Sequence, residues 1–595
     1  MSIFLAFPPL LLIIHCLFIF LFKRWLGPIG TFYASLSVNF FLISSLIYTL
    51  YLLLYSGSFY FIDFGRLFFC LDLIDSNLVF CVDTLSLLAS TLVLILTSLA
   101  LYFGVEYMYR DAFINRLLYL LNLFATSVVF LFFVYDYFLI LFVWECIGLF
   151  SFLLVNFYSS RIYTIKAALK TFVFSRISDL FMFLAFILTI LVYNTTDLSL
   201  IFLETPYFLF YYLSCWLFKI HFLSIFTFSL ALSGAIKAAQ FFFHVWLPDA
   251  MEAPTPASAL IHSSTLVVAG VFLIIRFSLV FEFTQFVNFF LIILGGLTLV
   301  FGAVTATFQV DIKKLVAYST ISQIGYLVCG CGFCAYEEVL FYLVIHALNK
   351  AFLFILVGYI VHYFNGNTDM RLMGGSFLYS FEIAVLLFTV GLNLAGLPYS
   401  AGFISKEFLL YQVSKGDFIS LFIRGCWLIS FFFTPIYMLM LTFLVTFNIK
   451  KAPITVYSSV LNLKNYFIKL HSTSKTSYSI KFMNTNITSR LTSYILFLFW
   501  VFFNFAGEYF LLILYNFSTL YDTIPSPSFF LLKQPNTFLL ISNSVNFLSN
   551  LSFFIFFLVS SSIIFLININ LTVNWNYFRK NNILMFFLSL LLFLI

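Results

Sequence analysis

Long uninterrupted apolar runs are the feature that most constrains the fold of this chain. Stretches such as 84–103 and 136–157 are apolar on every side, and each has about the 20 residues that a helix needs to cross a bilayer core roughly 30 Å thick. A transmembrane β-barrel would instead show alternating segments of about 10 residues. Only 9% of the 595 residues are charged, against about 25% in soluble chains. We therefore predict an all-α polytopic membrane protein and exclude the soluble and disordered classes.

The apolar runs also predict the number of spans, about 14 to 16 transmembrane helices. The first run has no basic region before it and no small-residue cleavage site after it, so we predict a transmembrane helix there and not a signal peptide. Residues 194–221 fit either a lengthened helix or an interfacial segment. The runs lie near 3–22, 33–55, 84–103, 117–134, 136–157, 172–193, 221–246, 258–276, 286–305, 316–334, 338–362, 381–413, 418–447 and 491–516, with later apolar stretches at 551–571 and 584–595.

Basic residues gather on one set of alternate loops. That set holds 17 Lys and Arg against 6 acidic residues, whereas the opposite loops hold 2 against 11. Because Lys and Arg concentrate on the cytoplasmic or matrix side of a membrane, the pattern predicts that the N-terminus lies outside. Residues 450–490 carry 7 Lys and Arg and no acidic residue, so topology accounts for the net charge of +6 and we expect no nucleic-acid partner.

Four charged residues lie inside predicted spans. Glu145 and Lys350 fall at the middle of their runs, Lys237 lies deep in its run among small residues, and Lys406 follows a Gly/Pro cluster that predicts a discontinuous helix. Together such charges cost roughly 10–14 kcal/mol on insertion scales, and they usually mark an ion or proton path. The structural alternative is an interhelical ion pair such as Glu145 with Lys237, which leaves Lys350 and Lys406 with no evident deep carboxylate besides Glu407.

Two histidines and a further charged pair extend this set. His346 precedes Lys350 by one helical turn on the same face, and His262 follows a Pro-rich segment. Histidine titrates near neutral pH and can pass protons between lysines, although a buried histidine can also be only a hydrogen-bonded packing residue. Arg176 and Asp179, at i and i+3, either couple to the path or form a local pair.

The arrangement repeats along the chain. Lys237 occupies a late span of a five-span block that begins near 117, and Lys406 occupies the corresponding span of a block that begins near 286. Five-span units in opposite orientation are how many transporters build a pathway at the midplane of the membrane. We therefore predict two inverted five-helix repeats.

Four segments resemble one family. Trp144–Leu149 reads WECIGL, Ser233–Gly270 begins SGAIKAAQFFFHVWLPDAMEAPTP, Asp311–Tyr326 reads DIKKLVAYSTISQIGY and Gly402–Phe408 reads GFISKEF. In this order they resemble the NADH dehydrogenase subunit 5 family, the largest antiporter-like membrane subunits of respiratory complex I. The resemblance runs from about 80 to 415.

The resemblance implies an organisation for the whole chain. It places N-terminal transmembrane helices in 1–110 and antiporter-like five-helix units in 116–276 and 286–447. A basic matrix-side loop is expected in 448–490. The remaining residues, 491–595, are expected to form a helix, a lateral helix along neighbouring subunits and a terminal anchor helix.

The resemblance also implies roles for the charged residues. Glu145 pairs with Lys237 in the first unit, Asp179 modulates that pair, and the other relay residues link it to the half-channel at Lys406. Tyr342 stands where many members carry a second histidine. The implied proton relay consists of Glu145, Lys237, His262, His346, Lys350 and Lys406, with Arg176, Asp179 and Glu407 as modulating residues.

The implied function is proton translocation coupled to electron transfer from NADH to ubiquinone in other subunits. The chain shows no Gly-rich phosphate loop after a strand and no cysteine framework for a cluster. We expect no cofactor in this chain, and NADH, FMN, iron–sulfur clusters and ubiquinone in its partner subunits. Cys329, Cys331 and Cys334 lie close together beside glycines, which favours helix packing over a metal site. The expected partners are other membrane-arm subunits, especially neighbouring antiporter-like subunits, and lipids.

Two other functions stay open. A subunit of a multi-subunit Na⁺/H⁺ antiporter would share these motifs, and a scaffold subunit would use the charges only to hold helices together. The chain contains 88 Phe residues, which favours a T-rich coding sequence of the kind found in organellar genomes. We therefore expect an organelle-encoded, multi-pass protein of the mitochondrial inner membrane.

Overall fold

The computed structural model describes residues 2–447, with gaps inside this range. The gaps are 57–59, 67–76, 109–110, 216–217, 365, 376–380, 397–399 and 414–417. The basic loop predicted at 448–490, and the helix, lateral helix and anchor predicted within 491–595, lie outside the described residues.

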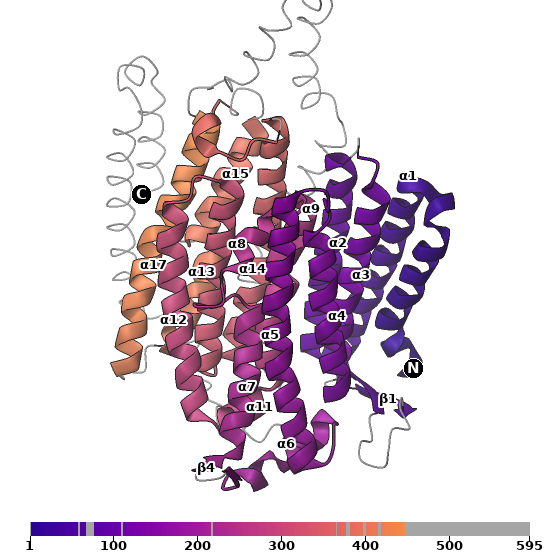
Figure 1. The fold of residues 1–595 in the computed structure, drawn as a ribbon, viewed down its shortest axis with the longest axis vertical. Coiled ribbons are helices and arrows are strands. Elements are labelled where there is room, and N and C mark those ends of the chain that lie inside the picture. Colours follow the sequence, from indigo (N-terminus) through magenta and orange to yellow (C-terminus); the bar gives the residue numbers. More distant parts are fainter. Residues whose placement is uncertain are drawn as a thin grey trace, which may run out of the picture.

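The described residues form a bundle of helices that run roughly along one axis (Figure 1). Helix α1 lies at one edge of the bundle and α17 at the opposite edge. The long helices are α1 (Ser2–Ser56), α2 (Thr84–Tyr107), α3 (Ile114–Phe133), α4 (Tyr137–Val155), α5 (Ile162–Tyr193), α7 (Phe222–Lys237), α12 (Gln285–Thr307), α13 (Ile312–Gly332), α14 (Tyr336–Tyr363) and α17 (Phe418–Thr442), which continues as a π-helical turn, Phe443–Phe447.

Shorter helical pieces complete these long helices or connect them. Ten helical segments of the described part are long and apolar enough to cross a membrane by length and composition. They include the broken segment Thr255–Arg276, whereas α7 is one of the shorter apolar helices. The shorter pieces are α6 (Leu198–Glu204), α8 (Trp246–Asp249), α9 (Thr255–Ser263), α10 (Leu266–Arg276), α11 (Ser278–Glu282), α15 (Phe381–Ala395) and α16 (Ala401–Val413), with 3₁₀ turns at Thr205–Phe208, Ala250–Glu252 and Met370–Leu372.

Local sequence explains where several helices begin and bend. Asp83 caps α2 by accepting a hydrogen bond from the Ser86 amide, and the Ser86 hydroxyl accepts one from the Asp83 amide in return. Inside α1, Gly27 adopts a φ of 63° directly before Pro28. Glycine accepts this conformation without a Cβ clash, so the two predicted spans 3–22 and 33–55 are joined across a kink.

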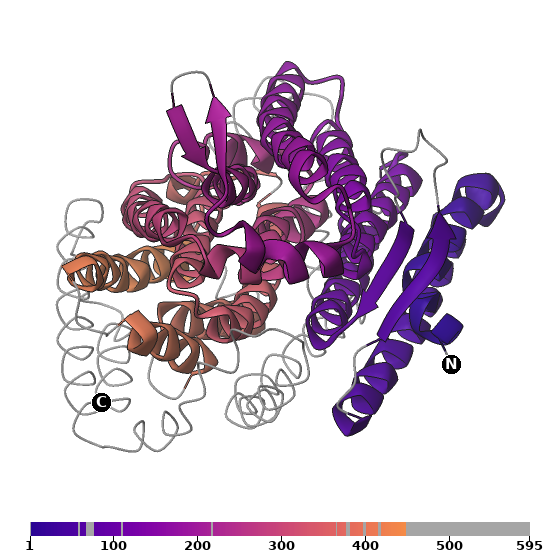
Figure 2. The ribbon, with the colours of Figure 1, turned by 90° about the horizontal axis from the view of Figure 1, so that it is seen from below.

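Two small antiparallel hairpins lie at one end of the bundle, where Figure 2 looks along the helices. β1 (Tyr60–Arg66) pairs with β2 (Asn77–Val82), and β3 (Tyr212–Cys215) pairs with β4 (Phe218–His221). The prediction of an all-α fold therefore holds for the membrane-spanning helices and omits these hairpins. The ambiguous segment 194–221 consists of α6, a 3₁₀ turn and the second hairpin.

Besides the kink at Gly27, three breaks interrupt the membrane-spanning helices within the described residues. The predicted break at the Gly/Pro cluster is confirmed, because α15 ends at Ala395, α16 begins at Ala401 and Gly396 has a φ of 80°. Two further breaks fall within the apolar runs 221–246 and 258–276. Helix α7 ends at Lys237 and is followed by Ala239 and Phe242 with positive φ, and α9 and α10 are separated at residues 264–265. Apolar composition does not reveal such breaks, because irregular backbone is tolerated where surrounding protein covers it.

Candidate functional site

Lys237 is the last residue of α7 and lies at its break. Its side chain is 1% exposed, and its Nζ donates a 2.6 Å hydrogen bond to the carbonyl oxygen of Trp144 on α4. The same Nζ lies 3.8 Å from the Trp144 ring centroid and 3.8 Å from Asp179 Oδ1 on α5. A buried ammonium is costly unless it is paired and hydrogen-bonded, and these contacts from two other helices hold it in place.

The carboxylate beside Lys237 is that of Asp179, not that of Glu145. Arg176 lies 3.4 Å from Asp179 and 3.7 Å from Glu145, so the charges form a chain from Lys237 through Asp179 and Arg176 to Glu145. The direct Glu145–Lys237 ion pair expected from the sequence is therefore corrected. Successive residues of a helix point in different directions: the Trp144 ring is buried against Lys237, whereas the Glu145 side chain is 47% exposed and reaches Arg176.

Trp144 is a contact residue of Lys237 that the sequence did not single out. Its indole Nε1 donates a 3.1 Å hydrogen bond to the Ser178 hydroxyl, which in turn donates to the Ser233 carbonyl on α7. These bonds fix the ring and backbone that face the ammonium. The sequence signal that could have identified Trp144 was its position next to Glu145 in the WECIGL segment, because an indole ring is a favourable partner for a cation.

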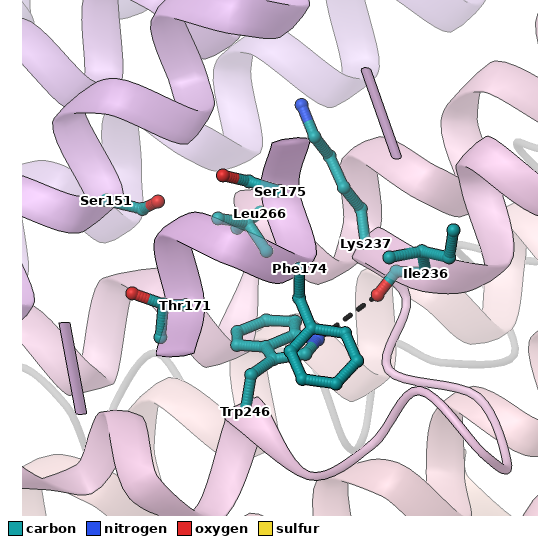
Figure 3. Close-up of a pocket in the computed structure, with 8 residues that line it drawn as sticks. All are labelled: Ser151, Thr171, Phe174, Ser175, Ile236, Lys237, Trp246 and Leu266. Carbon is teal, nitrogen blue, oxygen red and sulfur yellow. Dashed lines mark hydrogen bonds between the residues drawn. The ribbon is translucent and has the colours of Figure 1, made fainter. Parts of the chain in front are cut away.

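A small pocket lies beside Lys237 (Figure 3). Three hydroxyl side chains line it on one side, and Trp246 lines it below, held by a 3.1 Å hydrogen bond from its Nε1 to the Ile236 carbonyl. These hydroxyl groups and the lysine amine could serve as the two to four polar partners that a buried water molecule needs, although the rest of the lining is apolar. The pocket is lined by Ser151, Thr171, Phe174, Ser175, Ile236, Lys237, Trp246 and Leu266.

The two predicted relay histidines are completely buried. His262 lies in the last turn of α9, beside the break before α10, and its ring stacks on Phe354 of α14 at 5.8 Å. His346 lies on α14 one turn before Lys350, as predicted. Within the described residues neither ring nitrogen of either histidine has a hydrogen-bond partner. A buried polar group without a partner costs about 1–3 kcal/mol, so hydrogen bonding in the core does not account for these residues.

The other two lysines also lie in the core, with neutral oxygens as hydrogen-bond partners. Lys350 Nζ donates a 2.6 Å hydrogen bond to the Ser319 hydroxyl on α13. Lys406 Nζ donates a 2.6 Å bond to the Leu394 carbonyl, in the last turn of α15 before the break. Both lysines are at most 1% exposed. The break thus provides a backbone carbonyl to a buried ammonium, as discontinuous helices do at ion sites.

Asparagine side chains hold the broken ends of α15 and α16 together. Asn393 Nδ2 donates to Asn349 Oδ1 on α14 at 2.9 Å, and Asn393 Oδ1 accepts a 2.8 Å hydrogen bond from the Gly402 amide. Glu407, a predicted modulating residue, follows Lys406 on α16 and is partly buried. The cysteine segment forms part of the packed core, and within the described residues no group of three or more His, Cys, Asp or Glu side chains is placed to hold a metal ion.

Comparison with known families finds one match across the centre of the chain. The family described as NADH:quinone oxidoreductase/Mrp antiporter, TM, matches residues 134–434. This range contains the Lys237 site, both buried histidines and the Lys350 and Lys406 positions.

Three similar proteins carry the name NADH-ubiquinone oxidoreductase chain 5. That of Nyctotherus ovalis is 39% identical over 80% of this chain and 26% of its own length. That of Chondrus crispus is 37% identical over 67% of this chain and 59% of its own length. That of Paramecium tetraurelia is 35% identical over 66% of this chain and 69% of its own length. The chain thus spans about a quarter and about three fifths of the first two relatives.

A solved structure shares the fold. A chain in the structure of the Mrp complex from Dietzia sp. DQ12-45-1b has a TM-score of 0.63 and 24% sequence identity. The similarity covers 81% of this chain and 51% of that chain. It therefore extends beyond the family match at 134–434 and supports the arrangement of helices described above.

Proposed function

We propose a function on one premise: this chain belongs to the NADH:quinone oxidoreductase/Mrp antiporter family of membrane proteins. The chain translocates protons in the membrane arm of respiratory complex I, coupled to electron transfer from NADH to ubiquinone in other subunits. The observation that carries this proposal is Lys237, an ammonium buried at a helix break, with the Asp179 carboxylate 3.8 Å from its Nζ and a small pocket beside it.

In this proposal the residues of the first unit hold and release a proton at Lys237 Nζ. The Trp144 carbonyl and the Asp179 carboxylate stabilise the protonated amine, and the pocket gives water access to it. Because Arg176 also contacts Asp179, a change in the Arg176–Glu145 pair alters how strongly Asp179 attracts Lys237. Such a switch lets an ion pair control when a buried amine keeps its proton.

The path continues, in this proposal, from the first unit to the second. His262, His346 and Lys350 pass protons across the core, and Lys406 faces the second half-channel at the α15–α16 break. The polar residues sit on α9, α14 and α16, three helices of one packed bundle. A charged residue inside a membrane is by default a candidate for an ion or proton path. The buried positions of these residues fit that role better than positions facing lipid would.

The decisive experiment replaces Lys237 by methionine in the assembled complex. We expect Lys237→Met to reduce proton pumping coupled to NADH oxidation at least about tenfold, because a thioether carries no proton, while methionine retains the length and packing of the lysine stem. Pumping is measured as acidification across resealed inner-membrane vesicles. Lys166→Met is the matched control, because Lys166 is exposed on α5, and it should pump normally. Normal pumping in Lys237→Met would exclude the proposed relay.

A second pair of variants tests which carboxylate matters at Lys237. We expect Asp179→Asn to reduce pumping more than Glu145→Gln does, because of these two carboxylates only that of Asp179 lies within 4 Å of the ammonium. The opposite order would support a direct action of Glu145. A scaffold role for the charges would give a different result. In that case both variants and Lys237→Met would fail to assemble, and none of them would give an assembled complex that does not pump.

One observation favours a second candidate function. The shared fold with a chain of the Dietzia Mrp complex is also what a subunit of a multi-subunit Na⁺/H⁺ antiporter would show. Purification of the native complex separates the two functions. Co-purifying flavoprotein and iron–sulfur subunits support complex I, whereas their absence together with Na⁺-dependent proton movement in vesicles supports the antiporter.

The proposal also includes a cellular location for the chain. It is an organelle-encoded protein of the mitochondrial inner membrane, in contact with lipids and with neighbouring antiporter-like subunits. The chain itself holds no redox centre, and NADH, FMN, iron–sulfur clusters and ubiquinone bind partner subunits. Mass spectrometry of the purified complex tests the partners, and sequencing of mitochondrial DNA tests the location of the gene.

A further inference from the structure

Two pairs of aspartates face each other across isolated antiparallel β-bridges. Asp136, directly before α4, lies opposite Asp197, and Asp311, directly before α13, lies opposite Asp369. Like charges that lie directly opposite each other in such a pair destabilise it. Each bridge therefore needs a way to relieve the repulsion between its two carboxylates.

The two bridges have the same backbone geometry. In each, the residues that flank the aspartates make two hydrogen bonds, so the aspartates form a non-hydrogen-bonded pair, the kind whose side chains approach each other most closely. The surroundings of the carboxylates, not the backbone, distinguish the two bridges. The bonds run from the amides of Tyr137 and Leu198 to the carbonyls of Thr196 and Tyr135, at 2.9 and 3.3 Å, and from those of Ile312 and Met370 to those of Thr368 and Val310, at 3.0 and 3.1 Å.

Basic residues neutralise the second bridge. Lys314 Nζ lies 3.6 Å from Asp311 Oδ2, and a guanidinium nitrogen of Arg371 lies 2.7 Å from Asp369 Oδ2. Each carboxylate of this bridge thus has its own cation.

The first bridge has no such cation. Asp136 is completely buried, and no Lys or Arg of the described residues lies within 4 Å of its carboxylate or of that of Asp197. Asp197 Oδ1 is also buried, and it has no hydrogen-bond partner in the part of the chain that the structure describes. A buried carboxylate without a cation is costly, so this bridge relieves its repulsion in another way.

The neighbouring elements bring acidic and neutral groups to this bridge. Asp63 on β1 and the Tyr135 hydroxyl act on Asp197. The Arg276 guanidinium lies 5.7 Å from the centre of the Tyr135 ring, but the Asp83 carboxylate engages it. A proton is therefore the positive charge available to the pair.

Asp136 also holds the start of α4 in place. Its Oδ1 accepts hydrogen bonds from the amides of Phe138 and Leu139, at 2.8 and 3.2 Å. Its Oδ2 accepts a 2.7 Å bond from the Thr196 hydroxyl, in the connection between α5 and α6. The bridge thus ties the first turn of α4 to the α5–α6 connection.

The pair titrates near neutral pH. Burial raises the pKa of Asp136 to about 7, and the negative charge of Asp197 adds to that rise, although the hydrogen bonds to Asp136 oppose it. In the second bridge the hydrogen bonds from Arg371 lower the pKa of Asp369 instead. Asp136 precedes the membrane-spanning segment Tyr137–Val155, and Asp197 is partly exposed, so water at this end of the bundle reaches the pair.

We propose that Asp136 and Asp197 form a proton-operated latch: one proton held between the two carboxylates closes the bridge between α4 and the α5–α6 connection, and its loss loosens the bridge. The proton comes from water at the end of the bundle that holds α6 and β1 (Figure 1), the end that the loop charges predict to be outer. It forms an O–H bond on one carboxyl group and is donated to an oxygen of the other, so Asp197 Oδ1 gains a partner. The regulatory meaning rests on the proposed function, in which protons accumulate on that side, whereas the latch itself does not.

The latch closes in acid. The closed bridge binds its proton more tightly than an open one, whose carboxyl group has the ordinary pKa of about 3.9, so the closed form loses stability as pH rises up to about 7. Between pH 6 and pH 8 this linkage raises the opening equilibrium about tenfold. Helix α4 carries the Trp144 carbonyl that binds Lys237, so the latch holds this helix more firmly when the outer side is acidic.

Hydrogen exchange in the purified complex tests the latch, with the second bridge as an internal control. After correction for the intrinsic pH dependence of exchange, we expect the Tyr137 and Leu198 amides to lose protection about tenfold between pH 6 and pH 8. The Ile312 and Met370 amides occupy the same positions in the second bridge, and their protection should stay constant. Equal protection of the Tyr137 and Leu198 amides at both pH values would overturn the proposal.

Two substitutions assign the change in protection to the pair. Asp136→Asn should abolish it, because asparagine caps a helix about as well as aspartate but does not titrate. Asp197→Asn should move it to lower pH, because the facing negative charge is gone. An unaltered change in either variant would overturn the latch, and Asp197→Asn decides the matter if Asp136→Asn does not assemble.

Two controls separate the latch from general pH effects and from the proposed function. Asp311→Asn alters the second bridge only, and it should leave the pH dependence at Tyr137 and Leu198 unchanged. Lys237→Met should also keep that pH dependence, so failure of the proposed relay and failure of the latch give different results. Loss of the pH dependence in Asp311→Asn would contradict a local origin at Asp136 and Asp197.

Discussion

The contact between α7 and α10 provides a quantitative test of how Lys237 is held. Gly234 on α7 and Gly270 on α10 face each other so closely that a Cβ at Gly234 would lie 2.9 Å from the Gly270 carbonyl oxygen. A Cβ at Gly270 would lie closer still to the Gly234 oxygen, and 3.1 Å from the Ala238 amide nitrogen. Carbon and oxygen atoms meet at about 3.3 Å or more, so Gly270→Ala must push the two helices apart.

The size of the expected loss of stability follows from a comparison with a glycine that has open space around it. A Cβ added at Gly425 on α17 would have nothing within 4 Å of it, so Gly425→Ala gains only the helix propensity of alanine, about 1 kcal/mol. Gly270→Ala gains the same amount, which cancels in the comparison, and loses about 1–3 kcal/mol to overpacking. We therefore expect Gly270→Ala to be about 1–3 kcal/mol less stable than Gly425→Ala, a ratio of about 5- to 150-fold in the folding equilibrium.

The assay is denaturation of the purified complex in mild detergent, with the unfolding midpoint of this subunit followed by proteolysis. Gly234→Ala should fall between the two other variants, because its clash is smaller. Proton pumping should fall together with stability in Gly270→Ala, since Gly234 lies one turn before Lys237 on α7. Equal midpoints for Gly270→Ala and Gly425→Ala would refute the packing argument.

Two further predictions concern ion pairs outside the proposed relay. Arg276→Met should destabilise the fold by about 3–5 kcal/mol in a denaturation experiment, because it leaves the buried Asp83 carboxylate without its ion-pair partner. The double variant Asp83→Leu with Arg276→Met should recover part of that loss. No recovery would contradict the ion-pair explanation. In the loop after α14, hydrogen bonds from Arg371 lower the pKa of Asp369. The pair therefore contributes stability above the unfolded pKa of about 3.9 and loses it as pH falls through the lower folded pKa. Hydrogen exchange of the Arg371 amide should be unaffected by this titration between pH 8 and 5 and lose protection only in more acidic buffer, a change that Asp369→Asn should lack.

The sequence alone was informative about the membrane-spanning helices and the positions of unusual charges. Each of the apolar runs predicted up to residue 447 corresponds to a helix, or to a broken helix, in the described part. Lys237, Lys350 and Lys406 are buried there as expected. Hydropathy and burial of charge are properties of individual residues and short windows, so they can be read without knowing how helices pack.

Only the tertiary structure decided which groups meet. Whether Asp179 or Glu145 lies beside Lys237 depends on how α4, α5 and α7 are rotated about their axes. The spacing of residues along one helix does not show how that helix is rotated relative to its neighbours. The breaks after Lys237 and before α10 depend on neighbouring protein that covers the freed backbone, and the pairing of Tyr342 with Gln323 depends on the contact of α13 with α14. The sequence therefore determined which residues are costly to bury in a membrane, and packing determined which partner each of them meets.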